Sequence, residues 1–93
     1  MQNISELHAI FYGRVQGVFF RVTIRNIAKQ LNVKGYVKNL SDGAVELIAQ
    51  ASKDILDTLI DSIQNKPGYA SIDKIEKKYV KPTKIFDEFK IIY

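Results

Sequence analysis

The stretch from Glu6 to Leu31, ELHAIFYGRVQGVFFRVTIRNIAKQL, carries a strand pattern, a loop with two glycines and a helix pattern in succession. Between residues 6 and 15, side chains alternate so that Leu7, Ala9 and Phe11 share one face. This alternation predicts a β-strand with both faces at least partly covered. Apolar residues then recur every three or four positions from about Phe20, which predicts an amphipathic helix that ends near residue 32.

A hairpin pattern follows this helix. The runs GYVKNL (35–40) and AVELIAQ (44–50) flank Ser41-Asp42-Gly43. Asp-Gly between two apolar runs is a strong hairpin signal, because glycine accepts a positive φ angle. We therefore expect two short antiparallel strands joined by a tight turn.

The last third of the chain predicts a second helix and a final pair of strands. Ser52 is placed to cap the helix, whose apolar stripe runs from Ile55 to Ile63 and which NKPG (65–68) ends. The next strand begins near Ala70, with a three-residue step from Ile72 to Ile75 that indicates a bulge. After a loop that includes Pro82, the alternating residues Phe89, Ile91 and Tyr93 predict a short closing strand.

The element order is therefore β-α-β-β-α-β with a short closing strand, which favours an α+β, ferredoxin-like βαββαβ sandwich. We expect an antiparallel sheet with two helices on one face. At 93 residues, the length predicts one domain over 1–93 and a modest core. Because this fold serves many unrelated functions, it leaves the activity open.

Composition narrows the function classes. The chain has no cysteine and a single histidine, His8, so we expect no disulfide, thiolate chemistry or protein-built metal site. No apolar run reaches the roughly 18 residues of a membrane span, and the start of the chain lacks a signal-peptide pattern. We expect a cytoplasmic protein, monomeric, without membrane or nucleic-acid partners and without a cofactor. The formal charge of +4 favours anionic ligands.

The loop GRVQGVFFR (13–21) is the candidate anion site. It lies where the predicted strand ends and the helix begins, so its amides lack strand or helix partners and can form a positive concavity. The helix N-terminus adds free amides, and Arg21 adds a rigid cationic fork suited to phosphate. The loop is neither a Walker loop nor a G-x-G-x-x-G motif. A glycine-containing turn with a surface arginine is the structural alternative.

Two motifs resemble those of a known family. The loop at 13–21 is similar to the acylphosphatase signature G-x-V-Q-G-V-x-F-R. GYVKN (35–39) followed by DGAVE (42–46) resembles the second signature, G-[WY]-V-x-N and D-G-x-V-E. Both occur in the expected order and at the expected separation, and the resemblance extends over essentially the whole chain.

The resemblance implies a metal-independent hydrolase that cleaves small acyl phosphates into a carboxylate and inorganic phosphate, which also inhibits as product. Arg21 matches the family's catalytic arginine and Asn39 its catalytic asparagine, while loop amides would bind the phosphate oxygens. These amides belong to Gln16, Gly17, Val18, Phe19 and Phe20. Two positions depart from the common pattern: Leu40 replaces a polar residue, and Ile92 lies where arginine is frequent.

Several alternatives stay open. Asn39 could instead cap the turn at 41–43 as an Asx residue. An acylphosphatase-like module that binds phosphate or carbamoyl phosphate without turnover is the main rival function. An RNA-binding module is disfavoured because the strand at 44–50 has no aromatic residue, and a metal chaperone would need cysteines.

Other polar side chains are expected to have structural roles. We expect Arg14 and Arg25 to lie on the surface and His8 to be a surface or half-buried strand residue. Asp42 and Glu46 are expected to serve as turn chemistry and solvated charge. Lys77 and Lys78 are expected on an exposed sheet edge.

Overall fold

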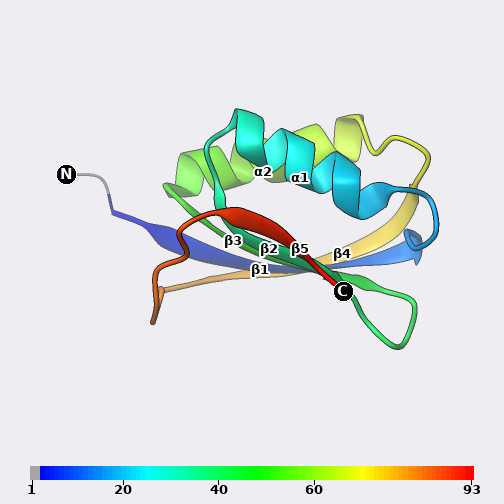
Figure 1. Ribbon diagram of the computed structural model, residues 1–93. Helices are drawn as coiled ribbons and strands as arrows, with labels where there is room; N and C mark the ends of the chain where they lie inside the picture. The colour runs from blue at the N-terminus through cyan, green and yellow to red at the C-terminus, as the bar shows by residue number, and fades with distance from the viewer. Residues whose placement is uncertain (1–2) are drawn as a thin grey trace.

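A computed structural model describes residues 3–93, so positions 1 and 2 of the expected domain and of the N-terminal stretch lie outside the described part. The element order is β1 (Ser5–Arg14), α1 (Phe20–Gln30), β2 (Lys34–Asn39), β3 (Val45–Ala51), α2 (Lys53–Asn65), β4 (Ser71–Val80) and β5 (Phe89–Ile92). One sheet in the order β4-β1-β3-β2-β5 carries both helices on the same face (Figure 1). The ferredoxin-like α+β prediction is confirmed.

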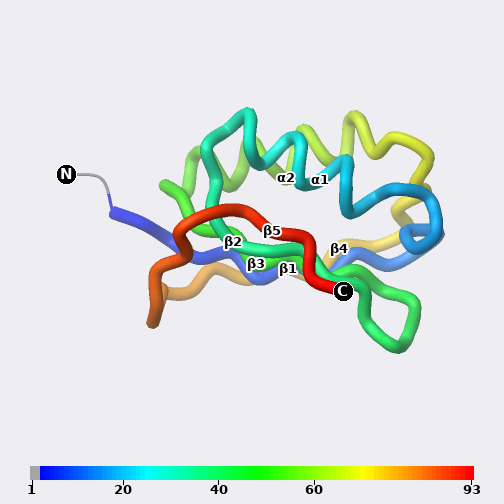
Figure 2. Tube along the Cα trace, in the orientation of Figure 1, coloured from blue at the N-terminus to red at the C-terminus, as the bar shows by residue number. Residues whose placement is uncertain are grey.

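The sheet is mixed rather than antiparallel, which corrects the sequence expectation. β5 pairs with β2 in parallel, with Gly35 opposite Phe89, whereas the other three pairings are antiparallel. The difference arises because β4 and β5 occupy opposite edges of the sheet. The segment 81–88 carries the chain from one edge to the other, so β5 arrives in the direction of β2 (Figure 2).

The core lies between the helices and the sheet. α1 covers β2 and β5, and α2 packs on β3 and β1. From β1, the predicted face of Leu7, Ala9 and Phe11 is buried, and the ring of Phe11 meets that of Phe20 edge-on at 5.3 Å between centroids. Phe20 thus anchors the first turn of α1 in the core, directly beside the predicted anion site.

The predicted local signals are present. The amide of Ile55 donates to the Ser52 hydroxyl over 3.4 Å, which caps α2. Asp42 accepts a hydrogen bond from the amide of Ala44 at 3.0 Å within the hairpin turn. In β4, Tyr12 pairs with Lys74 and the next residue of β1 pairs with Ile72, so Asp73 bulges inside the predicted step.

The face of the sheet opposite the helices carries a hydrogen-bonded polar cluster. Gln50, which is 4% exposed, donates to Glu6 at 2.7 Å and to the carbonyl of Lys84 at 2.6 Å. It also accepts from the amide of Phe86 at 3.0 Å. The segment that leads to β5 is therefore fastened to the centre of the sheet. No helix of the described residues is long and apolar enough to cross a membrane.

Candidate active site

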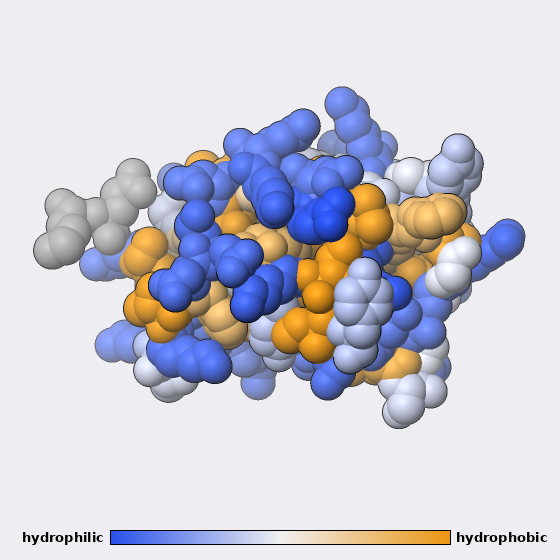
Figure 3. Space-filling model, in the orientation of Figure 1, coloured by the Kyte–Doolittle hydropathy of each residue, from blue (hydrophilic) through white to orange (hydrophobic). Residues whose placement is uncertain are grey.

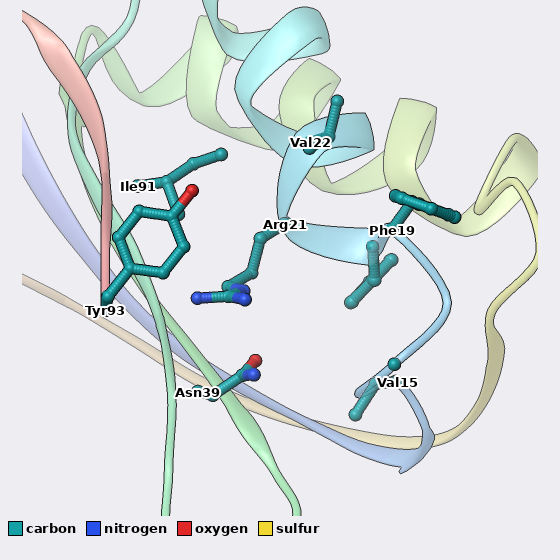
Figure 4. Close-up of a pocket in the computed structure, with 9 residues that line it drawn as sticks. Val15, Phe19, Arg21, Val22, Asn39, Ile91 and Tyr93 are labelled. Carbon is teal, nitrogen blue, oxygen red and sulfur yellow. The ribbon is translucent and has the colours of Figure 1, made fainter.

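A pocket of about 400 Å³ opens where the start of α1 meets the ends of β2 and β5. Arg21 enters it from α1, Asn39 from β2 and Tyr93 from the residue after β5. Figure 4 shows the guanidinium of Arg21 between the Tyr93 ring and the Asn39 amide. Two residues that sequence reasoning singled out separately, Arg21 and Asn39, thus share one cavity.

The loop between β1 and α1 is shaped by glycines. Gly13 has a φ of 128°, and a Cβ there would lie 2.3 Å from the carbonyl oxygen of Ser71, so only glycine permits this close approach to β4. Gly17 has a φ of 73°, while a Cβ on it would meet nothing within 4 Å. The first glycine is therefore required by packing and the second by the backbone conformation of the loop.

The N-terminus of α1 is free to bind an anion. Its N-cap residue, Phe19, makes no side-chain cap, and no acidic side chain lies in the first turn. In the described part of the chain, the amides of residues 16–22 donate to no backbone acceptor. Unpaired amides at the positive end of a helix dipole attract a dianion such as phosphate.

Arg21 is held from the side of β5. Its guanidinium carbon lies 4.8 Å from the centroid of the Tyr93 ring, and Nη1 donates to the carbonyl of Ile92 at 3.4 Å. These contacts occupy one flank of the guanidinium and leave the remaining donors available in the pocket. The sequence did not identify Tyr93 as a site residue, because its contact with Arg21 depends on the parallel placement of β5.

Asn39 ends β2 on the face of the sheet that α1 covers. Its neighbour on that face, Val37, is fully buried in the core. The Oδ1 atom of Asn39 is buried and accepts no hydrogen bond from residues 3–93. The turn at 41–43 is instead held by Asp42, so Asn39 does not serve as its Asx cap. A buried acceptor without a protein partner is suited to bind water or substrate.

Gln16 joins the two halves of the site. Its Nε2 donates to the carbonyls of Leu40 at 2.8 Å and Ala44 at 2.9 Å. The loop that ends β1 is thereby fixed to the turn that follows Asn39. Neither Gln16 nor Val18 is among the residues that line the pocket, and Val18 is 9% exposed and packs in the core. Of the predicted loop residues, Gly17, Phe19 and Phe20 line it.

The two departures from the family pattern touch the site through their backbones. Leu40 accepts the hydrogen bond of Gln16 with its carbonyl, and Ile92 accepts that of Arg21 in the same way. A carbonyl is present whatever the side chain, so both contacts survive the substitutions.

The remaining candidates lie elsewhere. Arg14 is exposed, Arg25 donates to Asn26 at 3.4 Å, and neither lines the pocket.

His8 is half-buried on the far face of the sheet, where its Nε2 lies 2.5 Å from Oε2 of Glu6. Lys77 and Lys78 are exposed on the edge strand β4, as predicted, and Glu46 contacts the hydroxyl of Tyr36 at 3.3 Å.

The buried carboxyl group of Glu6, which does not line the pocket, has a shifted pKa. Burial alone would raise the pKa of Glu6, but the hydrogen bonds from His8 and Gln50 outweigh it and leave the pKa below its ordinary value.

Across residues 3–93, no group of three or more His, Cys, Asp or Glu side chains comes close enough to hold a metal ion.

Comparison with known proteins identifies the family. Residues 7–91 match the family model described as Acylphosphatase. The acylphosphatase of Treponema denticola is 41% identical over 80 residues, which cover 86% of this chain and 85% of that protein. The crystal structure of acylphosphatase from Bacillus subtilis superimposes with a TM-score of 0.90 at 28% identity, covering 96% of this chain and 99% of that one.

A similar fold also occurs inside a larger protein. Full-length HypF, crystallised in a phosphate- and nucleotide-bound form, matches all of this chain with a TM-score of 0.92 at 29% identity, but only 12% of its own length is covered. The likeness to the free-standing relatives extends over most of both sequences, and the family match spans both motifs. The chain belongs to the acylphosphatase family.

Proposed function

We propose that this protein hydrolyses the carboxyl–phosphate bond of small acyl phosphates in the pocket that Arg21 and Asn39 share. One observation carries the proposal: a fixed guanidinium, unpaired helix amides and a buried unpaired amide oxygen line or adjoin a single cavity. The first two suit a phosphoryl group and the third suits the water that attacks it. Membership of the acylphosphatase family supports the same reaction.

The phosphoryl group would be bound by charge and by amide donors. Arg21 and the amides of residues 16–20 would contact the oxygens, over which negative charge spreads during phosphoryl transfer. Donors fixed before the reaction stabilise this charge without reorganising. Gln16 contributes its amide to this set, while its side chain keeps the loop in place relative to Asn39.

Asn39 would orient the attacking water. Its neutral amide accepts from and donates to a water, whereas a carboxylate at this position would be repelled by the phosphate. The water oxygen forms a bond to phosphorus as the bond from phosphorus to the acyl oxygen breaks, and the carboxylate leaves with the electron pair. A phosphate oxygen of the substrate takes the proton from water, so no protein base is needed.

The reaction as proposed requires neither a general acid nor a metal ion. A carboxylate is a good leaving group without protonation, and Arg21 supplies the positive charge that a metal would otherwise provide. Acyl phosphates share the phosphoryl end that the loop binds, and inorganic phosphate, as product, would compete for the same donors.

A second function is favoured by the likeness to HypF. HypF contains the same fold as a small part of a longer chain and was crystallised in a phosphate- and nucleotide-bound form. We therefore keep, as the second candidate, a module that binds phosphate or carbamoyl phosphate without significant turnover. Binding without turnover would leave the phosphate contacts of Arg21 intact and make the water position at Asn39 irrelevant.

Steady-state hydrolysis of benzoyl phosphate in ¹⁸O-labelled water, with and without EDTA, separates these functions. We expect turnover that EDTA does not reduce, with one ¹⁸O atom in the released phosphate and none in benzoate. Phosphate binding without turnover would establish the binding module. A strict Mg²⁺ requirement, or label in the benzoate, would contradict the proposed mechanism.

A further inference from the structure

Phe19 is an exposed aromatic residue in an unfavourable backbone conformation at the mouth of the pocket. Its side chain is 75% exposed, and its φ and ψ angles are 59° and 23°. Residues other than glycine, asparagine and aspartate rarely adopt this left-handed region, which costs a bulky side chain free energy.

The fold does not require an aromatic side chain at this position. The adjacent Phe20 anchors α1 in the core, whereas Phe19 occupies the N-cap position and its side chain makes no capping hydrogen bond. Glycine would relieve the backbone, and asparagine would both relieve it and cap the helix. What distinguishes Phe19 is therefore its exposed apolar surface at the edge of the pocket that it helps to line.

The rest of the pocket continues this apolar surface. Apart from Arg21 and Asn39, its lining side chains are apolar or aromatic, and they include Val22, Ile91 and Tyr93. No lysine and no acidic residue lines it. In Figure 3, apolar surface lies beside the C-terminal end of β5, with polar surface on the other side. In Figure 4, Phe19 and Tyr93 lie on opposite sides of Arg21.

The pocket has room for more than the phosphoryl group. A volume of about 400 Å³ lies within the range of small-molecule sites, roughly 300–1,000 Å³. A phosphoryl group fills the space of only a few waters of about 30 Å³ each. The remainder of the substrate therefore meets the apolar walls.

We propose that Phe19 is a specificity-determining residue, whose ring forms one wall of an acyl-group subsite and favours aromatic acyl phosphates over small or charged ones. The inference rests on the proposed hydrolysis and names the substrate class for the same pocket. An aromatic acyl group removes apolar surface of Phe19 from water, whereas an acetyl group is too small to cover it. A free carboxylate on the acyl group would lose hydration against uncharged walls.

The test compares acyl groups within each variant, so that any shared effect on the phosphate loop cancels. The measured quantity is kcat/KM for benzoyl phosphate divided by kcat/KM for acetyl phosphate. In Phe19→Gly, which accepts the left-handed backbone, we expect this ratio to fall about 10-fold from the wild-type value. In Phe19→Leu, which keeps an apolar side chain under the same backbone strain, we expect a fall of less than about threefold.

Tyr69→Ala provides the matched control, because Tyr69 is an exposed aromatic that does not line the pocket. Its ratio should equal that of the wild type. An unchanged ratio in Phe19→Gly, or an equal fall in Tyr69→Ala, would overturn the inference. Succinyl phosphate, whose acyl group carries a free carboxylate, extends the test. The ratio of kcat/KM for benzoyl phosphate to kcat/KM for succinyl phosphate should be larger in the wild type than in Phe19→Gly.

A binding measurement separates failure of this inference from failure of the proposed function. Calorimetry gives the dissociation constants of phenylphosphonate and methylphosphonate, neither of which is hydrolysed. If the wild type binds both but turns over no acyl phosphate, hydrolysis is wrong, and the ratio of the two constants still tests the Phe19 wall. That ratio should favour phenylphosphonate in the wild type and approach unity in Phe19→Gly.

Discussion

Replacing Gln16 by methionine should loosen the site and destabilise the fold together. The change removes hydrogen bonds of 2.8 and 2.9 Å to the carbonyls of Leu40 and Ala44. Each carbonyl keeps a second donor, since the amide of Gly43 lies 3.3 Å from Leu40 and the amide of Leu40 lies 2.8 Å from Ala44. The loss is therefore that of two hydrogen bonds, without the larger penalty of orphaned acceptors.

The expected magnitude follows from this count. At about 1 kcal/mol for each neutral hydrogen bond, Gln16→Met should lower the free energy of unfolding by about 2 kcal/mol. For a domain of this size, that corresponds to a fall in Tm of roughly 8–16 °C. Methionine has a similar volume and is flexible, so no large cavity adds to the loss.

The kinetic consequence is separate from the loss of stability. Without Gln16, the phosphate loop and the strand end that carries Asn39 can move relative to each other. We expect kcat for benzoyl phosphate to fall by about 10- to 100-fold at a temperature where the variant is folded, because small misplacements of reacting groups have large effects.

Urea unfolding and steady-state kinetics on the same samples measure both effects, with Gln30→Met as control. Gln30 is exposed at the end of α1, so this change should stay within about 0.5 kcal/mol of the wild type. Destabilisation with unchanged kcat would limit Gln16 to a structural role. Unchanged stability would refute the reasoning that the two hydrogen bonds hold the loop.

Three further outcomes test other contacts. Arg21→Ala should reduce kcat/KM for benzoyl phosphate by about 10³-fold or more, and Arg21→Lys should recover only part of it; an unchanged value in steady-state assays would exclude the assigned role. Tyr93→Ala should raise the inhibition constant of phosphate by about two- to fivefold, since an exposed cation–π contact contributes about 0.5–1 kcal/mol, while Tyr93→Phe should match the wild type. Glu6→Gln should destabilise the protein by about 1–2 kcal/mol at neutral pH. Because the pKa of Glu6 is lowered in the folded state, this difference should be complete above the ordinary carboxyl value of about 4.3 and should shrink in urea titrations as the pH falls from there through the lower pKa of the folded state; a difference that stays constant over that range would contradict the pKa argument.

The order of strands and helices could be predicted from the sequence because its signals are local. Alternation around Phe11, the Asp42-Gly43 turn and the Ser52 cap each depend on neighbouring residues. The parallel pairing of β5 was missed because it depends on how the segment 81–88 crosses the sheet. That path is fixed by Gln50, a residue far away in the sequence.

The site was predictable to a similar extent. The place of Arg21 at a glycine loop and a helix start identified a candidate anion ligand from physical chemistry alone. Asn39 was identified only through its family motif, and its burial became visible with the fold. The bracing role of Gln16 and the contact between Tyr93 and Arg21 join residues distant in sequence, and no local pattern marks either one.

The central claim is that Arg21 holds the phosphoryl group while Asn39 places the water. Asn39→Ala separates these roles when kcat for benzoyl phosphate and the inhibition constant of inorganic phosphate are measured on the same protein. We expect kcat to fall by about 10²-fold or more while the inhibition constant stays at the wild-type value. Asn65→Ala, at the exposed end of α2, should change neither. An unchanged kcat, or an equal loss of turnover and phosphate binding in Asn39→Ala, would contradict the claim.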